Sequence, residues 1–230
     1  MKISKRLQTV AELVPEGMTV ADIGTDHGYV PIYLAHKGRS PHIIAMDINK
    51  GPLQKAINNI AENNVSHIVS ARLSNGLEMM KEGEAQCIII AGMGGPLINT
   101  IIKSGINIAH SAEKLILSPQ SEVDKTRSFL IDEGFFIENE TMVAEDGKFY
   151  FIMEVRNGKS PDYSESELEF GKYLIERRNM VMKSFLLREK ELCDRIMTAL
   201  IMTGRTDSAR YAEVTKRINM ISEGLSAYDN

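Results

Sequence analysis

The sequence predicts an α/β protein in which a mainly parallel sheet of seven strands precedes a C-terminal helical hairpin. Two observations support this prediction. Between residues 19 and 156, short runs rich in Ile and Val alternate with helical stretches, which is typical of a parallel sheet with crossover helices. After residue 163, apolar residues recur at helical spacing over two long segments.

Strands are expected where the apolar runs are short and are followed by Gly, Asn, Ser or Pro, because such residues place a loop at the strand's carboxyl end. These runs are residues 19–23, 42–47, 67–73, 87–91 and 114–117. Helices are expected between them, at residues 31–37, 50–63, 96–103 and 122–133. Runs 135–143 and 148–156 then form an antiparallel hairpin at the sheet edge, because Asp146-Gly147 between them favours a tight turn.

A linker-like stretch at residues 157–162 separates the sheet region from the helical region, so we expect two domains, 1–158 and 163–230. The first helix is expected to run for roughly thirty residues and to end at Gly204. The second is expected from about residue 206 to 225, packed antiparallel on the first like a short coiled coil. The first helix has two apolar stripes, Leu174, Val181, Phe185, Leu192, Ile196 and Leu200, and Met182, Leu186, Cys193 and Met197.

Composition places the 230-residue chain among folded, water-soluble proteins, with 43% hydrophobic and 25% charged residues. No apolar run approaches the roughly 20 residues that cross a bilayer. The basic start of the chain lacks the apolar segment of a secretory signal, so we expect a cytoplasmic protein. Cys87 and Cys193 are expected to be structural residues, with no disulfide and no metal site.

The formal net charge of −4 conceals an uneven distribution of charge. Residues 171–217 contain eleven Lys and Arg against six Asp and Glu. This local excess has two interpretations, a solvated helix face with alternating charges or a surface that faces phosphates.

The first expected strand ends in a loop that combines glycines with acidic residues, from Asp22 through Gly24, Asp26 and His27 to Gly28. A strand, a glycine turn and a helix together offer backbone N–H groups and let a ligand approach the main chain. The glycines lack the G-x-G-x-x-G spacing of dinucleotide sites, and Asp26 would repel a pyrophosphate. The acids instead suit S-adenosylmethionine, which carries a sulfonium and an ammonium group. The alternative is a tight turn without a ligand.

Three later strand ends add candidate cofactor contacts. Asp47, about 20 residues beyond the loop, is placed to accept hydrogen bonds from ribose hydroxyls or to cap the next helix. Asn75 and Gly76 either meet an adenine edge or form a plain turn. Three glycines in four residues, Gly92, Gly94 and Gly95, imply a ligand close to the backbone. This position lacks the Asn/Asp-Pro-Pro-aromatic turn of enzymes that methylate amino groups, so we expect methylation of a ring nitrogen.

Several motifs together resemble the bacterial tRNA (adenine-22-N1)-methyltransferase family over the whole chain. They are Arg6-Leu7, residues 21–29, Gly92-Met93-Gly94-Gly95, and Leu117-Ser118-Pro119-Gln120 with Arg127. Gly28 and Val30 stand where many members are expected to have Ala and Leu. The resemblance implies a Rossmann-like sheet with a C-terminal coiled-coil domain, and tRNA as the substrate. It also implies S-adenosylmethionine as the cofactor, bound by Asp22, Gly24, His27, Asp47, Asn75 and Gly92.

The resemblance also places Asp26 at the reaction centre. Adenine N1 is a nucleophile, but its methylation makes the ring cationic, and a carboxylate would stabilise that charge or take a proton from N6. Capping of the helix that begins near Gly28 is the alternative role of Asp26.

Two other functions stay open at this stage, a methyltransferase for a small molecule or a protein and a non-catalytic binding protein that keeps the fold. The sequence leaves the oligomeric state undetermined. The cations available to RNA are Lys2, Lys5 and Arg6, and, in the helical region, Arg177, Arg178, Lys183, Arg188, Arg195, Arg210, Lys216 and Arg217.

Overall fold

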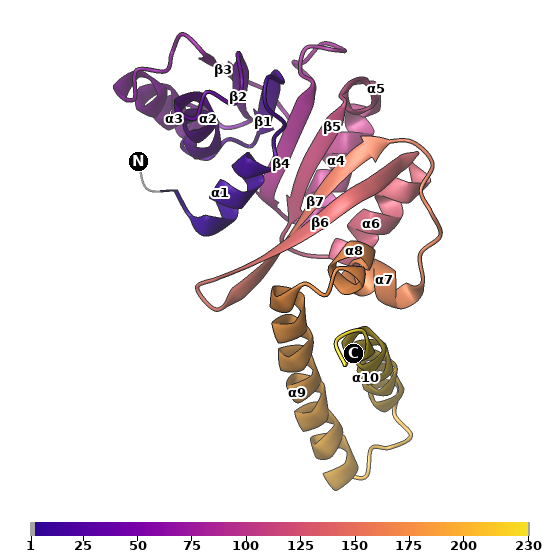
Figure 1. Ribbon diagram of the computed structural model, residues 1–230. Helices are drawn as coiled ribbons and strands as arrows, with labels where there is room; N and C mark the ends of the chain where they lie inside the picture. Colours follow the sequence, from indigo (N-terminus) through magenta and orange to yellow (C-terminus); the bar gives the residue numbers. More distant parts are fainter. Residues whose placement is uncertain (1–2, 230) are drawn as a thin grey trace. The chain divides into compact units, whose positions relative to one another are not determined.

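The computed structural model describes residues 3–229 and contains a sheet of seven strands in the order β3-β2-β1-β4-β5-β7-β6 (Figure 1). The strands are β1 Val20–Ile23, β2 Ile43–Asp47, β3 Val69–Leu73, β4 Cys87–Met93, β5 Lys114–Pro119, β6 Phe135–Glu145 and β7 Lys148–Asn157. The chain divides into two compact units, one made of residues up to 139 with 143–161 and the other of 140–142 with 162–230. The sheet and the C-terminal helix pair confirm the predicted fold class.

Parallel pairing joins β1 to β2 and β4, β2 to β3, and β4 to β5. The carboxyl ends of these five strands therefore lie along one edge of the sheet. After β3 the chain crosses to the other side of β1 to form β4. Parallel α/β sheets bind their ligands at such a reversal of strand order, so the loops after β1 and β4 are the expected place for a site.

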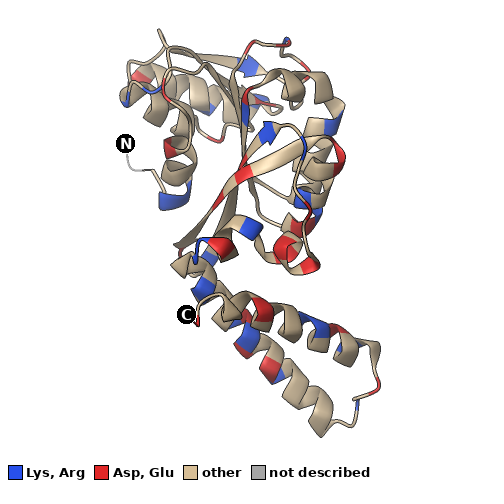
Figure 2. Ribbon diagram, turned by 45° about the vertical axis from the view of Figure 1, so that its right-hand side comes forward, with Lys and Arg blue, Asp and Glu red and all other residues tan. Residues whose placement is uncertain are grey.

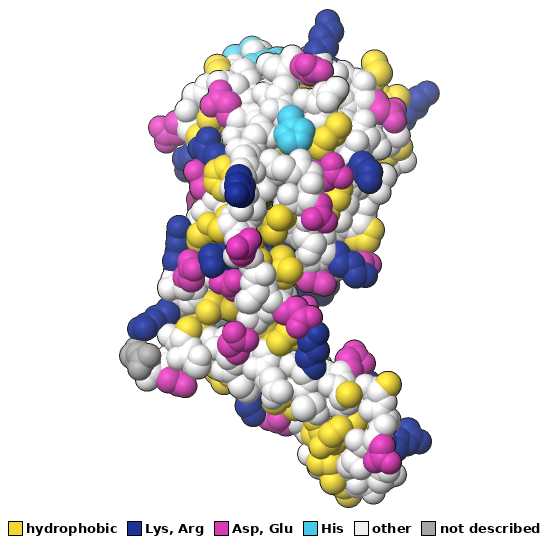
Figure 3. Space-filling model, turned by 90° about the vertical axis from the view of Figure 1, so that its right-hand side faces the viewer, with side chains coloured by type: hydrophobic (Ala, Val, Ile, Leu, Met, Phe, Trp, Pro, Cys, Tyr) yellow, Lys and Arg dark blue, Asp and Glu magenta, His cyan; other side chains and the backbone are white. Residues whose placement is uncertain are grey.

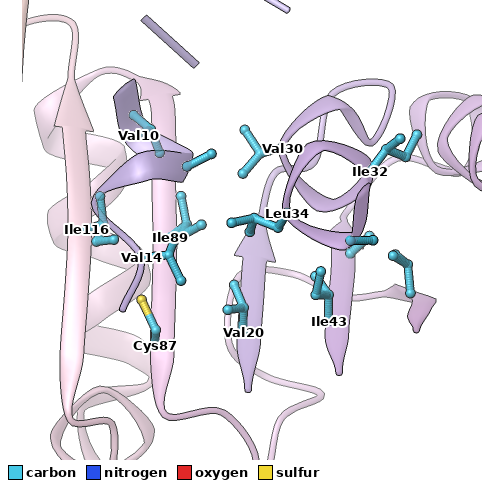
Figure 4. Close-up of a cluster of buried hydrophobic side chains, with 14 of the residues drawn as sticks. Val10, Val14, Val20, Val30, Ile32, Leu34, Ile43, Cys87, Ile89 and Ile116 are labelled. Carbon is cyan, nitrogen blue, oxygen red and sulfur yellow. The ribbon is translucent and has the colours of Figure 1, made fainter. Parts of the chain in front are cut away.

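Helices cover both faces of the parallel strands, which explains why β1, β2 and β5 are buried along their whole length. On one face, α1 Lys5–Glu12 and α2 Tyr29–His36 contribute Val10 and Leu34 to a core with Val20 and Ile89 (Figure 4). Alternate strand residues such as Ile88 point to the opposite face. There α4 Gly95–Ser104 packs against α6 Val123–Asp132 (Figure 1). The remaining helices of this unit are α3 Lys50–Glu62 and α5 Ile106–Ser111.

The last two strands form the predicted hairpin at the sheet edge, with β7 antiparallel to β5 and β6 outermost. Asp146 and Gly147 both have positive φ angles, 51° and 72°. A two-residue turn with two positive φ angles matches the twist of the flanking strands. The Asp-Gly signal in the sequence therefore predicted this turn correctly.

The helical region differs from the prediction in one respect, because the expected long first helix is broken. The structure has α7 Glu165–Phe170, α8 Lys172–Glu176 and α9 Met180–Met202. Arg178 has a φ of 51°, and the Asn179 side chain accepts hydrogen bonds from the N–H groups of Val181 and Met182. This cap starts a new helix, and the apolar periodicity on both sides conceals the break.

Helix α9 packs against α10 Ala209–Ser226, and Gly204 with φ 65° begins the turn between them. The buried stripe of α9 is Met182, Leu186 and Cys193, whereas Leu192 of the other predicted stripe is exposed. Figure 3 shows hydrophobic side chains gathered at the loop end of this hairpin. Ile201 and Met202 there are 54% and 82% exposed.

Cys87 and Cys193 are free thiols buried in the two units. Burial raises the pKa of Cys87 to about 12, so its thiol stays protonated and unreactive at neutral pH. No helix within residues 3–229 is both long enough and apolar enough to cross a bilayer.

Gly95→Ala is expected to lower the free energy of unfolding by about 1–3 kcal/mol, because the site has no space for a methyl group. A Cβ on Gly95 would lie 2.5 Å from the Ser121 carbonyl oxygen and 2.5 Å from Thr126 Oγ1. Urea denaturation measures the loss. Gly51→Ala is the matched control, because a Cβ there meets nothing within 4 Å. An equal effect of the two substitutions would contradict the close packing of α4 on α6.

Candidate active site

A polar cavity of about 330 Å³ opens at the carboxyl ends of β1, β4 and β5. Four predicted site residues line it, Asp22, Gly24, Asp26 and Gly92. The other lining residues are Arg6, Leu7, Tyr29, Val30, Ala91, Met93 and Gln120. The remaining predicted residues, His27, Gly28, Asp47, Asn75 and Gly76, lie outside this cavity.

Two other hollows, of about 450 and 550 Å³, lie on the helical unit. The first is lined by residues of α9 alone and the second by α10 with Glu165. A hollow along one or two surface helices is an open groove rather than an enclosed site. The cavity at the sheet edge, which is more enclosed and has converging polar groups, is therefore the candidate active site.

The loop after β1 depends on glycine for its shape. Gly24 and Gly28 have φ angles of 74° and 70°, a region that only glycine adopts without strain. A Cβ on Gly24 would also lie only 2.0 Å from Met93 Cε. His27 has a φ of 57°, and the Asn59 side chain donates to its carbonyl oxygen at 2.9 Å. Both glycines and the strained His27 thus fix the backbone that borders the cavity.

Asp22 is a buried acid, with only 6% of its surface exposed. Burial raises its pKa to about 6, and the negative charge of Asp47 acts in the same direction. The carboxyl group is therefore mostly ionised at pH 7 and mostly neutral below pH 6. A cationic ligand in the cavity would offset the cost of this buried charge.

Asp26, in contrast, has a side chain that is 81% exposed, and its Oδ1 lies 3.3 Å from Nε2 of His27. The His27 ring in turn stacks on Tyr29, with ring centroids 5.4 Å apart. Helix α2 has Gly28 as its N-cap residue, so Asp26 does not occupy the capping position that was its alternative role. Its carboxylate is available to a molecule in the cavity.

Asp47 is the last residue of β2 and Asn75 lies just after β3, both on the side of β1 away from β4. Asp47 is buried, and its Oδ1 accepts a hydrogen bond from the Asn49 N–H at 2.6 Å. Because Asn49 is the N-cap residue of α3, Asp47 orders the preceding turn and does not cap the helix. Asn75 is exposed and donates to Glu78 Oε1 at 2.7 Å. Next to it, Gly76 has a φ of 56°, and a Cβ there would lie 3.0 Å from the Ile101 side chain.

Gly92, the first of the three glycines that the sequence analysis singled out, forms a bulge near the end of β4. Ala91 pairs with Ser118 and Met93 with Pro119, so Gly92 is an extra residue in β4. Gly92 has a φ of 83°, and its backbone is exposed to the cavity. Bulges next to active sites redirect the chain and its side chains. The bulge accounts for Gly92, whereas Gly94 and Gly95 lie at the start of α4.

Arg6 is a cavity residue that sequence reasoning did not assign to the site. It comes from α1, a helix absent from the prediction. Ser4 is the N-cap of this helix, and its side chain accepts a hydrogen bond from the Leu7 N–H, so a capping signal was present in the sequence. Glu145 accepts hydrogen bonds from the N–H groups of Lys5 and Arg6 and so anchors this helix start. The Arg6 guanidinium lies over the ring of Tyr150, 5.2 Å from its centroid. Its Nη1 is buried and has no hydrogen-bond partner within residues 3–229.

The chain is similar to known methyltransferases in sequence and fold. Residues 3–153 match the family described as "Methyltransferase domain". The tRNA (adenine(22)-N(1))-methyltransferase of Bacillus subtilis is 37% identical over 191 residues, which cover 83% of this chain and 77% of the relative.

Two solved structures extend the similarity to nearly the whole chain. A putative tRNA (m1A22) methyltransferase from Streptococcus pneumoniae, solved with S-adenosyl-L-methionine, has a TM-score of 0.87 at 34% identity and covers 97% of this chain and 100% of that one. The M. capricolum TrmK structure with S-adenosyl-homocysteine has a TM-score of 0.85 at 29% identity and covers 99% of each chain. The chain therefore belongs to the tRNA (adenine(22)-N(1))-methyltransferase family.

Proposed function

We propose that this protein transfers a methyl group from S-adenosylmethionine to N1 of adenine 22 in tRNA. The observation that carries the proposal is the cavity itself. It brings a buried acid, Asp22, and an exposed acid, Asp26, together beside Gly24 and the exposed backbone of Gly92. The family relationship supplies the position of the target base.

The cavity fits the amino-acid end of the cofactor. The buried Nη1 of Arg6 lacks a partner within residues 3–229, and a carboxylate would satisfy it. Asp22 would hold an ammonium group, and the exposed backbone of Gly92 allows close approach of the cofactor. Asp47 would hold the ribose hydroxyls, with Asn75 and Gly76 near the adenine edge and His27 and Gly28 shaping the loop. The cofactor supplies a methyl group activated by a sulfonium.

The protein's own contribution to the reaction is alignment and electrostatics. Adenine N1 attacks with its own lone pair, so no covalent nucleophile from the protein is required. The ring becomes cationic as the new bond forms. The Asp26 carboxylate then accepts a hydrogen bond from the N6 amino group. The N6 protons become more acidic as the ring becomes cationic, and this hydrogen bond stabilises the positive charge.

The second compact unit is our candidate for tRNA contact, and we place the enzyme in the cytoplasm with its substrate. Acidic and basic residues are interspersed along α9 and α10 (Figure 2). Arg217 is bonded to Glu169 and Glu189, while Lys216 pairs with Glu165 and Arg210 with Glu213, so these cations are partly neutralised. Arg195 is exposed and makes no ion pair with any residue from 3 to 229. Exposed cations of this kind would face RNA phosphates.

Asp47→Ala is expected to weaken S-adenosylmethionine binding by about tenfold or more, because charge-assisted hydrogen bonds to the ribose are lost. Asp47→Asn keeps an oxygen for the Asn49 N–H, and we expect it to lose less affinity. Isothermal calorimetry on the folded variants measures both. An unchanged dissociation constant for Asp47→Ala would remove Asp47 from the cofactor site.

Incubation with methyl-labelled S-adenosylmethionine and undermethylated tRNA, followed by nucleoside analysis, tests the proposed function. We expect the label in 1-methyladenosine. Label in the amino group of a base, or no label in tRNA, would contradict the proposal. Label in a protein or a small metabolite instead would favour the other kind of methyltransferase.

A further inference from the structure

We propose that the side-chain amide of Gln120 recognises the N6 and N7 edge of the target adenine, which selects adenine and leaves N1 free for methylation. The inference rests on the proposed function and adds a specificity residue to it. Gln120 directly follows β5 and lines the cavity that contains Asp26 and Gly92. Its side chain is exposed, and its amide has no hydrogen-bond partner in the part of the chain that the structure describes.

The backbone that carries this amide is held firmly. The Gln120 N–H donates to the Met93 carbonyl oxygen at 2.9 Å. The next residue, Ser121, accepts a hydrogen bond from the Gly95 N–H at 3.0 Å. Pro119, immediately before Gln120, is paired with Met93 in the sheet. A fixed backbone with an uncommitted amide is the arrangement that a recognition residue requires.

The strand order places Gln120 on the substrate side of the site. The proposed contacts of the cofactor's ribose and adenine, Asp47 at the end of β2 and Asn75 after β3, lie on one side of β1, whereas β4 and β5 lie on the other. The Gly92 bulge lies next to Gln120, since a Cβ on Gly92 would be 3.9 Å from Gln120 Nε2.

The chemistry of the amide matches adenine and opposes guanine. A glutamine presents one acceptor oxygen and an NH2 donor, which pair with the N6 amino group and N7 of adenine. Guanine presents two acceptors, O6 and N7, at the same edge, so the amide oxygen would face O6. Adenine N6 has two hydrogens, one for Gln120 and one for Asp26, and N1 remains uncovered.

The test compares two tRNAs that differ only in N7 of base 22, one with adenine and one with 7-deazaadenine. The measured quantity is the ratio of kcat/KM for the adenine tRNA to that for the 7-deazaadenine tRNA. We expect this ratio to be at least about fivefold higher for the wild-type enzyme than for Gln120→Ala, which cannot contact N7. Gln120→Glu is expected to have the lowest ratio. Its carboxylate repels the N7 lone pair of adenine and so slows the adenine tRNA, whereas 7-deazaadenine has a C–H group at that position and is not repelled.

The matched control is Gln54→Ala, which removes an exposed glutamine of α3 that does not line the cavity, and it should keep the wild-type ratio. The same ratio in all four enzymes would overturn the proposal for Gln120. A loss of S-adenosylmethionine affinity in Gln120→Ala equal to its loss of kcat/KM would also overturn it, because Gln120 would then contact the cofactor. A wild-type enzyme that methylates neither tRNA would instead refute the proposed function.

Discussion

Asp26→Asn is expected to lower the single-turnover rate of methyl transfer by about a hundredfold or more, with little change in S-adenosylmethionine affinity. The substitution keeps the size of the side chain and removes its charge. That charge matters most when the adenine becomes cationic, so the loss falls on the reaction step rather than on binding. Single-turnover assays at saturating concentrations measure the rate, and calorimetry measures cofactor affinity.

Asp146→Asn is the matched control for this experiment, because Asp146 is an exposed acid in the turn between β6 and β7 that does not line the cavity. It should keep the wild-type rate. Parallel losses of rate and cofactor affinity in Asp26→Asn would show that Asp26 binds the cofactor instead. An unchanged rate would exclude Asp26 from the reaction.

Truncation after residue 161, the end of the first compact unit, is expected to remove most tRNA affinity and to preserve S-adenosylmethionine binding. All of the proposed cofactor contacts precede this point, and the local excess of Lys and Arg follows it. Each lost phosphate contact should lower the slope of log affinity against log salt by about 0.7–0.9. Titration of tRNA at several salt concentrations measures both quantities.

Arg195→Ala tests the same RNA-binding role in the full-length chain. We expect a smaller loss of tRNA affinity than truncation causes, and a salt slope lowered by about 0.7–0.9, the value for one phosphate contact. Arg210→Ala is its control, because Arg210 is already paired with Glu213. A truncated protein that binds the cofactor and retains full tRNA affinity with an unchanged salt slope would refute an RNA-binding role of the helical unit. Dimerisation would then be its better explanation.

The sheet was predictable because its signals are local. Each buried strand is a short apolar run with a loop residue after it, and Asp146-Gly147 identifies the edge hairpin directly. Helix α1 was missed because its start is held in part by a long-range contact, the hydrogen bonds from Lys5 and Arg6 to Glu145, which lies about 140 residues away in the sequence. The break before α9 was missed because apolar residues keep their helical spacing across Arg178.

The candidate site was predictable where glycines and acids lie at or just after strand ends, as at Asp22, Gly24, Asp26 and Gly92. Gln120 had appeared only as part of a family motif, and Arg6 as part of a family motif and as a cation available to RNA. Arg6 reaches the cavity through the packing of α1, and Gln120 through the pairing of β4 with β5 around an extra residue. Register and helix docking are long-range properties, and no local pattern in the sequence specifies them.

The most direct test of this account is to locate the methyl group on a defined tRNA. A transcript with adenine at position 22 should yield one labelled 1-methyladenosine and a new reverse-transcription stop at that base. The same transcript with guanine at position 22 should remain unlabelled. Label that persists in the guanine transcript, or a stop at a different adenine, would contradict the proposal that this protein methylates N1 of adenine 22.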